Sequence, residues 1–191
     1  MIKRIGSVLC ILLSIICLPI AKASPATPAT TLNKTLLAIH TLNATFQQIV
    51  QNQAGTILQK SNGSVLLERP GKFRWTTNKP APQTILTNGE KLWIYDPDLQ
   101  QVTIRLLKKN LAQTPMLLLT DPSIMLGKTF FIVEKKENKI DWYQLTPKAP
   151  SSAFKQLTVG FKNNTLFAMR LLNTLGQTTL LTFHNVTLNA P

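Results

Sequence analysis

One segment in the middle of the chain sets its architecture: Leu66–Leu107, LLERPGKFRWTTNKPAPQTILTNGEKLWIYDPDLQQVTIRLL. Apolar and polar residues alternate through most of it, with the period of two that is typical of strands buried on one face. Turn signals interrupt this alternation at Pro70-Gly71, at Asn88-Gly89 and at Asp96-Pro97-Asp98. We therefore expect short antiparallel strands that curve around one apolar face.

The same pattern continues toward both ends of the chain. Asn62-Gly63, Lys136–Lys139 and Asn163-Asn164 supply further hairpin or bulge signals. Pro80 and Pro82 predict a loop or a sheet edge, because proline cannot donate a hydrogen bond to a neighbouring strand. The sequence thus predicts a mainly β protein with about 11 or 12 short strands in antiparallel order.

Near the N-terminus the apolar residues recur at helical spacing. Leu32–Leu42 is expected to form a short amphipathic helix that ends at Asn43, with an apolar stripe made of Leu32, Leu36, Ile39 and Leu42. The next residues, Ala44–Gln51, alternate, with Phe46 and Val50 on one side. We expect them to form the first strand.

Lys108–Lys128 departs from the period of two. Thr114-Pro115 and Asp121-Pro122 each combine a capping residue with proline at the first helical position, and Gly127 supplies a stop signal. The segment predicts two short helices that are apolar nearly all round and must be buried against something. Two interpretations are open: the helices fill the open side of the sheet, or they form a lid over it.

The first 23 residues have the pattern of an export signal. Lys3 and Arg4 are followed by the apolar run Ser7–Ile20 and by the small residues of Ala21-Lys22-Ala23. The run is shorter than the roughly 20 residues that cross a bilayer as a helix. We expect residues 1–23 to be a cleaved signal peptide, 24–31 a flexible lead-in and 32–191 a single domain in the periplasm.

Both cysteines, Cys10 and Cys17, lie in this signal, and Ser24 follows the expected cleavage site. The exported chain is therefore expected to contain neither a disulfide nor a lipidated cysteine. Cleavage removes three of the 21 basic residues and leaves 18 against 8 acidic ones, a net charge of +10. Nucleic acid is not expected as a partner of an exported chain. The basic excess indicates either a solvated surface or attraction to anionic head groups or acidic proteins.

The sequence contains no recognisable catalytic or metal-binding constellation. His40 and His184 are far apart in the chain, and Asp96 and Asp98 flank a proline as turn formers. No nucleophile elbow, zinc motif or phosphate-binding glycine loop is present. We expect no enzymatic activity, no cofactor and no metal.

One charged residue is placed unusually. Val65, Leu67 and Arg69 share one face of a strand, which aims the guanidinium along the apolar side. A buried charge without a partner costs too much to be tolerated. Either the Arg69 side chain reaches a partner there, or Pro70-Gly71 turns it into water.

The strands that follow this arginine carry apolar residues in alternating positions. Several such strands in succession, covered only by short helices, predict a concave apolar surface with a cavity. The residues that predict it are Phe73, Trp75, Leu92, Ile94, Val102 and Ile104.

Several stretches resemble the LolA family of periplasmic carriers, which take lipoproteins to the outer membrane. In chain order they are Leu67–Trp75, Gln83, Asn88-Gly89, Leu92–Asp96, Gln101–Thr103, Thr114-Pro115 and Leu145–Lys148. The resemblance implies an incomplete, unclosed antiparallel β-barrel of about 11 strands with a lid of short α-helices. It further implies that the cavity takes the acyl chains of a lipoprotein.

The resemblance also implies residue roles and partners. Arg69 is expected to latch the lid to the barrel through carbonyls near Leu118 and Leu119. Expected partners are acylated lipoprotein cargo, an inner-membrane Lol ABC transporter and the outer-membrane receptor LolB, and the protein is expected to be a monomer. The acyl-chain cavity is expected to be lined by Phe46, Leu67, Phe73, Trp75, Leu92, Ile94, Val102, Ile104, Met116, Leu117 and Met125.

Three other functions compete with this one. The first is the receptor of the same pathway, which would need a lipidated cysteine where Ser24 stands. The second is a periplasmic adaptor or sensor that binds protein through the same fold. The third is an enzyme acting on lipids or cell-wall precursors, which no residue set supports. Family members usually continue past the equivalent of Pro191, so about one terminal strand and loop are expected to be missing.

Overall fold

A computed structural model describes residues 26–106, 126–150, 152 and 154–190. Within them, eleven antiparallel strands form a single sheet whose two end strands, β6 and β7, are not neighbours, so the sheet is unclosed. The order across it is β6-β5-β4-β3-β2-β1-β11-β10-β9-β8-β7. This confirms the mainly β, unclosed antiparallel fold. The strands are β1 (Thr41–Gln51), β2 (Ile57–Glu68), β3 (Lys72–Lys79), β4 (Gln83–Asn88), β5 (Lys91–Asp96), β6 (Gln101–Leu106), β7 (Phe130–Glu137), β8 (Ile140–Pro147), β9 (Phe154–Lys162), β10 (Thr165–Asn173) and β11 (Thr178–Leu188).

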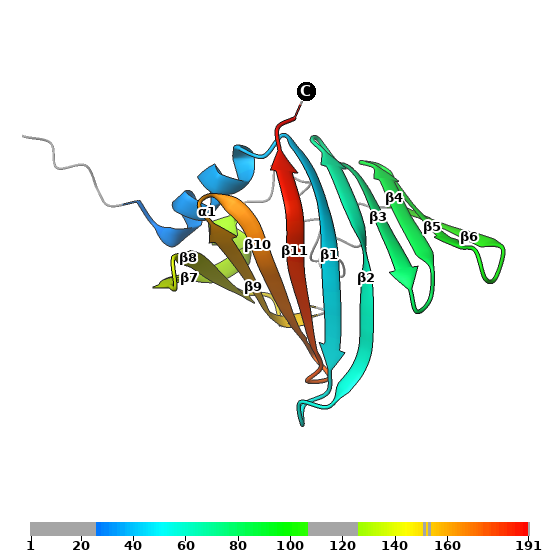
Figure 1. Ribbon diagram of the computed structural model, residues 1–191. Coiled ribbons are helices and arrows are strands. Elements are labelled where there is room, and N and C mark those ends of the chain that lie inside the picture. Colours follow the sequence, from blue (N-terminus) through cyan, green and yellow to red (C-terminus); the bar gives the residue numbers. More distant parts are fainter. Residues whose placement is uncertain (1–25, 107–125, 151, 153, 191) are drawn as a thin grey trace, which may run out of the picture.

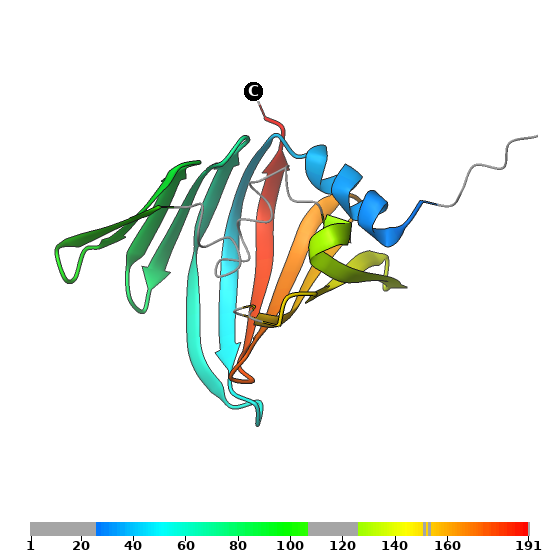
Figure 2. The ribbon, with the colours of Figure 1, turned by 180° about the vertical axis from the view of Figure 1, so that it is seen from behind.

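The sheet is strongly curved, with β1 and β11 at its centre and the two end strands at opposite sides (Figure 1). Two helices, α1 (Pro28–Leu37) and α2 (Leu126–Thr129), lie on the same side of the sheet, the side that faces the viewer in Figure 2. They contact each other and β7. We call this side the inner face and the opposite side the outer face.

The first helix begins earlier than expected. Thr27 caps it, since the Thr27 Oγ1 accepts a hydrogen bond from the Thr30 backbone N–H at 3.2 Å, and Pro28 takes the first helical position. The prediction that residues 24–31 are a flexible lead-in is therefore wrong from Pro28 onward. Leu32 and Leu36 are buried, as their helical spacing predicted.

The helix also ends earlier than expected. It stops at Leu37, and β1 begins at Thr41, so the predicted helix up to Leu42 and the predicted break at Asn43 are wrong. Leu42 is nevertheless buried, because it points to the inner face from β1. Over a few residues, the apolar spacing of an amphipathic helix can also fit the alternation of a strand. The sequence therefore does not show where α1 ends and β1 begins.

Most turn signals lie where the strands reverse. Asn88-Gly89 connects β4 to β5, and the Asn88 Oδ1 accepts hydrogen bonds from the backbone N–H of Glu90 and of Lys91. Asn163-Asn164 joins β9 to β10, and both residues have positive φ. For Asn62-Gly63 the prediction allowed a hairpin turn or a bulge. The structure has the bulge, because the β2–β3 register shifts between these two residues.

The second helix contradicts one stop signal. α2 runs through Gly127 to Thr129, so the predicted end at Gly127 is wrong. The Lys148 Nζ donates a hydrogen bond to the Gly127 carbonyl oxygen at 2.7 Å, and the Lys148 N–H donates to the Thr129 carbonyl at 3.0 Å. The rest of the segment with the two expected helices lies outside the described residues. Within the part that is described, no helix is long and apolar enough to cross a bilayer.

Candidate functional site

The inner face is built by strand register. Residues paired across antiparallel strands point to the same side, so pairing carries one face from strand to strand. One row runs through Ala44, Val65, Trp75, Ile85 and Ile94. A second row runs through Leu42, Leu67, Phe73, Thr87 and Leu92. Both rows are apolar almost throughout.

At one side of this face the two helices fill the space. Leu32 and Leu36 of α1 and Leu126 of α2 belong to the buried core. Phe130 stacks on Phe154 there, with ring centroids 6.2 Å apart. This part of the inner face, on β7–β10, is therefore an ordinary packed core.

At the centre of the face two aromatic rings meet. Phe46 of β1 is buried and pairs directly with Gly63 of β2. A Cβ on Gly63 would lie 2.7 Å from the Phe46 ring and would collide with the Thr76 carbonyl oxygen. The missing side chain lets Phe46 lie over β2 and reach Trp75 of β3. Sequence alone indicated the bulge at Gly63 but not this close approach.

Beside these rings the inner face is hollow. A pocket of about 180 Å³ opens there, and its surface is mostly apolar. It brings together β1, β3 and β9–β11, which are far apart in the sequence. The lining residues are Gln48, Trp75, Leu157, Met169, Leu171, Thr179 and Leu181.

Of these residues, only Trp75 was predicted for the site. The other apolar lining residues come from the last three strands, outside Leu66–Leu107: Leu157, Met169, Leu171 and Leu181. Their alternation, visible in Leu157, Val159 and Phe161, is the signal that predicts one apolar face. Which pocket that face joins is decided by the pairing of β11 with β1.

Six of the predicted cavity residues lie on the inner face: Phe46, Leu67, Phe73, Trp75, Leu92 and Ile94. The prediction is wrong for Val102 and Ile104. Ile94 pairs with Thr103, so Val102 and Ile104 point to the outer face, where they are 53% and 60% exposed. Met116, Leu117 and Met125 lie outside the described residues.

Arg69 continues the inner face past the end of β2. Its backbone N–H donates to the His40 carbonyl oxygen at 2.9 Å, which extends the β1–β2 ladder by one residue. Arg69 therefore shares a side with Val65 and Leu67, as alternation predicted. The residue is half-buried and its Nη1 atom is fully buried. Its expected latch partners, Leu118 and Leu119, lie outside the described residues.

Titratable groups near the inner face are few. Tyr143 is buried, its hydroxyl donates to the Glu134 Oε1 at 3.5 Å, and burial together with the Glu134 charge raises its pKa to about 12. On the outer face, the exposed Glu68 and Lys72 side chains form an ion pair at 3.0 Å. Among the described residues, no group of three metal-binding side chains comes together.

Comparisons with known proteins agree with this geometry. The sequence model of the family described as outer membrane lipoprotein carrier protein LolA matches residues 38–191. An outer-membrane lipoprotein carrier protein of Pseudomonas paraeruginosa is 39% identical over 149 residues, which are 78% of this chain and 72% of that protein. Its counterpart in Hahella chejuensis is 39% identical over 154 residues, covering 79% and 73%.

A solved structure supports the fold independently. The complex of MucA and MucB from Pseudomonas aeruginosa contains a chain with a TM-score of 0.53 and 15% identity, covering 86% of this chain and 58% of that one. At this identity the likeness is one of fold alone.

Proposed function

Since the chain belongs to the LolA family of outer membrane lipoprotein carrier proteins, we propose that it carries acylated lipoproteins across the periplasm. The carrier binds the acyl chains of a lipoprotein released from the inner membrane and delivers them to the outer membrane. The observation that supports this most is the apolar pocket between Trp75 and Met169 on the inner face.

The chemistry of the pocket suits an acyl chain. Exposing one CH₂ group to water costs about 0.8 kcal/mol, so a chain of a dozen methylenes costs on the order of 10 kcal/mol. A mostly apolar hollow provides shelter without directional contacts, so it does not select among chains closely. Gln48 and Thr179 are the polar residues in its wall. Such binding is strong enough for transit and compatible with release.

The same proposal assigns the compartment and the partners. An N-terminal export signal brings the chain to the periplasm. An inner-membrane Lol ABC transporter loads it, and the outer-membrane receptor LolB unloads it. The protein acts as a monomer without a cofactor, and it catalyses no reaction and binds no nucleic acid. An adaptor that binds protein through the same fold is disfavoured, because the family match rests on sequence as well as on fold.

The pocket is tested by two neighbouring leucines on one strand. Leu171 lines the pocket, whereas Leu172 pairs with Gln156 and points to the outer face. We expect Leu171→Lys to place an ammonium group in the acyl site and to lower the yield of co-purified acylated peptide at least tenfold, measured by mass spectrometry. Leu172→Lys is the matched control and should retain cargo. Equal yields from both variants would contradict the proposed site.

The latch is tested separately. Arg69→Leu should leave the thermal unfolding transition nearly unchanged but abolish transfer of lipoprotein from the inner to the outer membrane. Arg170→Leu is the control, because Arg170 is exposed and points outward from β10, next to Met169, which lines the pocket. Normal transfer by the Arg69 variant would refute the latch and leave the pocket proposal standing.

A further inference from the structure

The outer face of β2–β6 carries apolar side chains in cross-strand rows. One cross-strand row runs through Leu66, Arg74, Leu86, Trp93 and Ile104. The adjacent row changes from Ser64, Thr76 and Thr84 to Tyr95 and Val102 toward the sheet edge. Both rows become more apolar from the centre of the sheet to its end.

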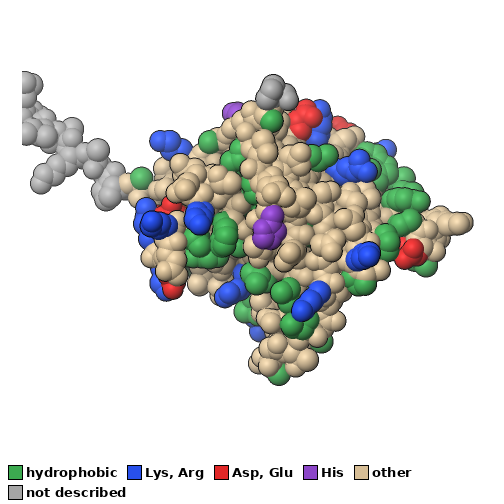
Figure 3. All heavy atoms as spheres, viewed as in Figure 1, with side chains coloured by type: hydrophobic (Ala, Val, Ile, Leu, Met, Phe, Trp, Pro, Cys, Tyr) green, Lys and Arg blue, Asp and Glu red, His purple; other side chains and the backbone are tan. Residues whose placement is uncertain are grey.

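These apolar side chains are exposed. We call the following residues the outer patch: Leu66, Leu86, Trp93, Tyr95, Val102 and Ile104. Five of them are 39–60% exposed and Trp93 is half-buried. Figure 3 shows apolar side chains gathered over β4–β6 and again on the β7–β10 side, with fewer over β1 and β11. A contiguous exposed patch of this kind marks an interaction surface more often than a scattered leucine does.

Cations border the outer patch. Lys72, Arg74 and Lys91 are exposed and share its face. The acidic residues beside them are Glu68, which pairs with Lys72, and Glu90, which precedes Lys91 in the β4–β5 turn. A hollow of about 500 Å³ lies at this border, and Leu66, Glu68, Lys72 and Arg74 contribute to its wall. Three cations and two carboxylates thus leave a small positive excess beside apolar and aromatic side chains.

We propose that the outer patch docks on an anionic lipid surface, a role separate from cargo binding because it uses the opposite face of the sheet. Tryptophan and tyrosine suit the boundary between head groups and acyl chains, since each has an apolar body and a polar atom. Valine, isoleucine and leucine enter the acyl region, while Arg74 and Lys91 meet lipid phosphates.

Charge disfavours the obvious competing occupant, a second copy of this chain. A two-fold dimer places the same patch of both copies face to face, so the cationic borders of both would meet. An anionic membrane instead attracts each cation near its surface by about 1 kcal/mol, equal to roughly a fivefold change in binding. The surface charge of the chain therefore complements a membrane and repels a copy of itself.

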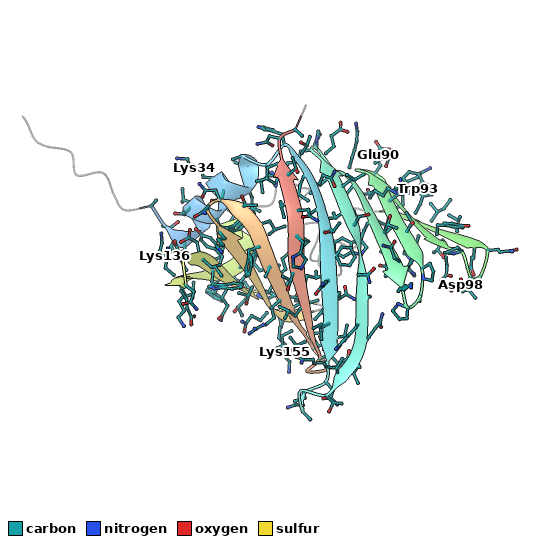
Figure 4. All side chains as sticks on the ribbon, in the orientation of Figure 1. Lys34, Glu90, Trp93, Asp98, Lys136 and Lys155 are labelled. Carbon is teal, nitrogen blue, oxygen red and sulfur yellow. The ribbon has the colours of Figure 1, made fainter. Side chains whose placement is uncertain are left out.

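The test uses cargo-free, naturally processed protein. The vesicles consist of neutral phosphatidylcholine, with or without roughly 30% of the anionic lipid phosphatidylglycerol. Flotation should show binding to the anionic vesicles that weakens with added salt. Arg74→Gln with Lys91→Gln should lower it about 25-fold. Lys155→Gln with Lys162→Gln removes equal charge from exposed positions of β9, which the sheet order separates from β5, and should change vesicle binding little. Lys155 lies away from Trp93 in Figure 4.

An apolar pair completes the test. Val102→Ser with Ile104→Ser should lower vesicle binding about tenfold, because less apolar surface is buried. Leu58→Ser with Leu175→Ser is the control, since these side chains are 52% and 80% exposed and do not belong to the outer patch. Equal losses in test and control pairs would overturn the proposal, as would wild-type protein that ignores lipid charge. A different result would assign the patch to a second copy of the chain: sedimentation detects a dimer, the Val102 and Ile104 substitutions dissociate it, and the wild-type protein does not bind vesicles. Uptake of lipid by the inner pocket would not depend on either outer pair, which separates this result from a failure of the carrier proposal.

Discussion

The rings of Phe46 and Trp75 stack at the centre of the inner face, with centroids 3.9 Å apart and planes inclined by 24°. Phe46 comes from β1 and Trp75 from β3, so the contact crosses the whole of β2. It joins the packed core to the pocket, because Trp75 also lines the hollow with Met169. The contact exists because the intervening strand has a glycine, Gly63, under the Phe46 ring.

Gly63→Ala should therefore destabilise the fold by about 1–3 kcal/mol, the usual cost of overpacking. The added methyl group meets the Phe46 ring and the Thr76 carbonyl, and a backbone carbonyl cannot move aside cheaply. Chemical denaturation of the purified variant measures the loss. Gly127→Ala is the control: its nearest neighbour is the Ala29 Cβ at 3.5 Å, and it lies in α2, so alanine should be neutral or slightly stabilising. Equal stability of both variants would show that Phe46 can move away from β2.

Asn189 should hold the junction between α1 and β1. Its Oδ1 accepts from the backbone N–H of His40 at 2.7 Å and of Thr41 at 3.2 Å, and its Nδ2 donates to the Ala38 carbonyl at 2.8 Å. Asn189→Ala should cost about 1–2 kcal/mol and speed amide exchange at the junction, measured by hydrogen exchange. Asn185→Ala is matched to it, because both residues are exposed with φ near +50°, whereas Asn185 lies within β11 and makes none of these three hydrogen bonds. A larger loss in the Asn185 variant would assign the effect to backbone conformation rather than to these hydrogen bonds.

Lys148 should fasten α2 to the sheet. Besides its hydrogen bond to the Gly127 carbonyl, its Nζ lies 4.9 Å from the centroid of the Phe131 ring, a cation–π contact. Lys148→Met keeps the aliphatic stem and removes both interactions, so amides of α2 should exchange about five- to tenfold faster, which corresponds to about 1 kcal/mol. Lys155→Met controls for the loss of an exposed lysine. Unchanged exchange in the Lys148 variant would mean that packing of Leu126 alone holds the helix.

Tyr143 should make stability fall at high pH. Its pKa is about 12 in the folded protein, above the ordinary value near 10, mainly because burial disfavours the phenolate. The unfolded chain loses the proton first, so the stabilisation is complete below pH 10 and is lost as pH rises toward 12. The chain contains two tyrosines, and Tyr95 is exposed, so ultraviolet titration can follow each phenol through single Phe variants. If Tyr143→Phe left the high-pH decline of stability unchanged, other groups would cause it.

Local signals predicted local structure well. Asn88-Gly89 forms the β4–β5 turn, because that residue pair adopts the required backbone conformations at little cost. Thr27-Pro28 starts α1. It has the same combination of a capping residue and proline as Thr114-Pro115, so this helix start is readable from the sequence. The α1–β1 boundary was missed, since Leu42 satisfies both periods.

The face that each strand presents required the whole sheet. Alternation shows that Val102 and Ile104 share a side, but not whether that side is inner or outer. Pairing of Ile94 with Thr103 decides it. The pocket is likewise a product of register, because Met169 and Trp75 lie far apart in the chain and meet only when β11 pairs with β1.

Composition, alternation and turn residues determined that this chain is a mainly β protein with one apolar sheet face, because those properties depend on neighbours in sequence. Tertiary structure alone decided where that face is filled and where it is hollow. It also decided that a second apolar surface, bordered by cations, lies outside. The reason is physical: side-chain direction alternates within a strand, while the choice of face and of contact partner depends on pairing between strands distant in the chain.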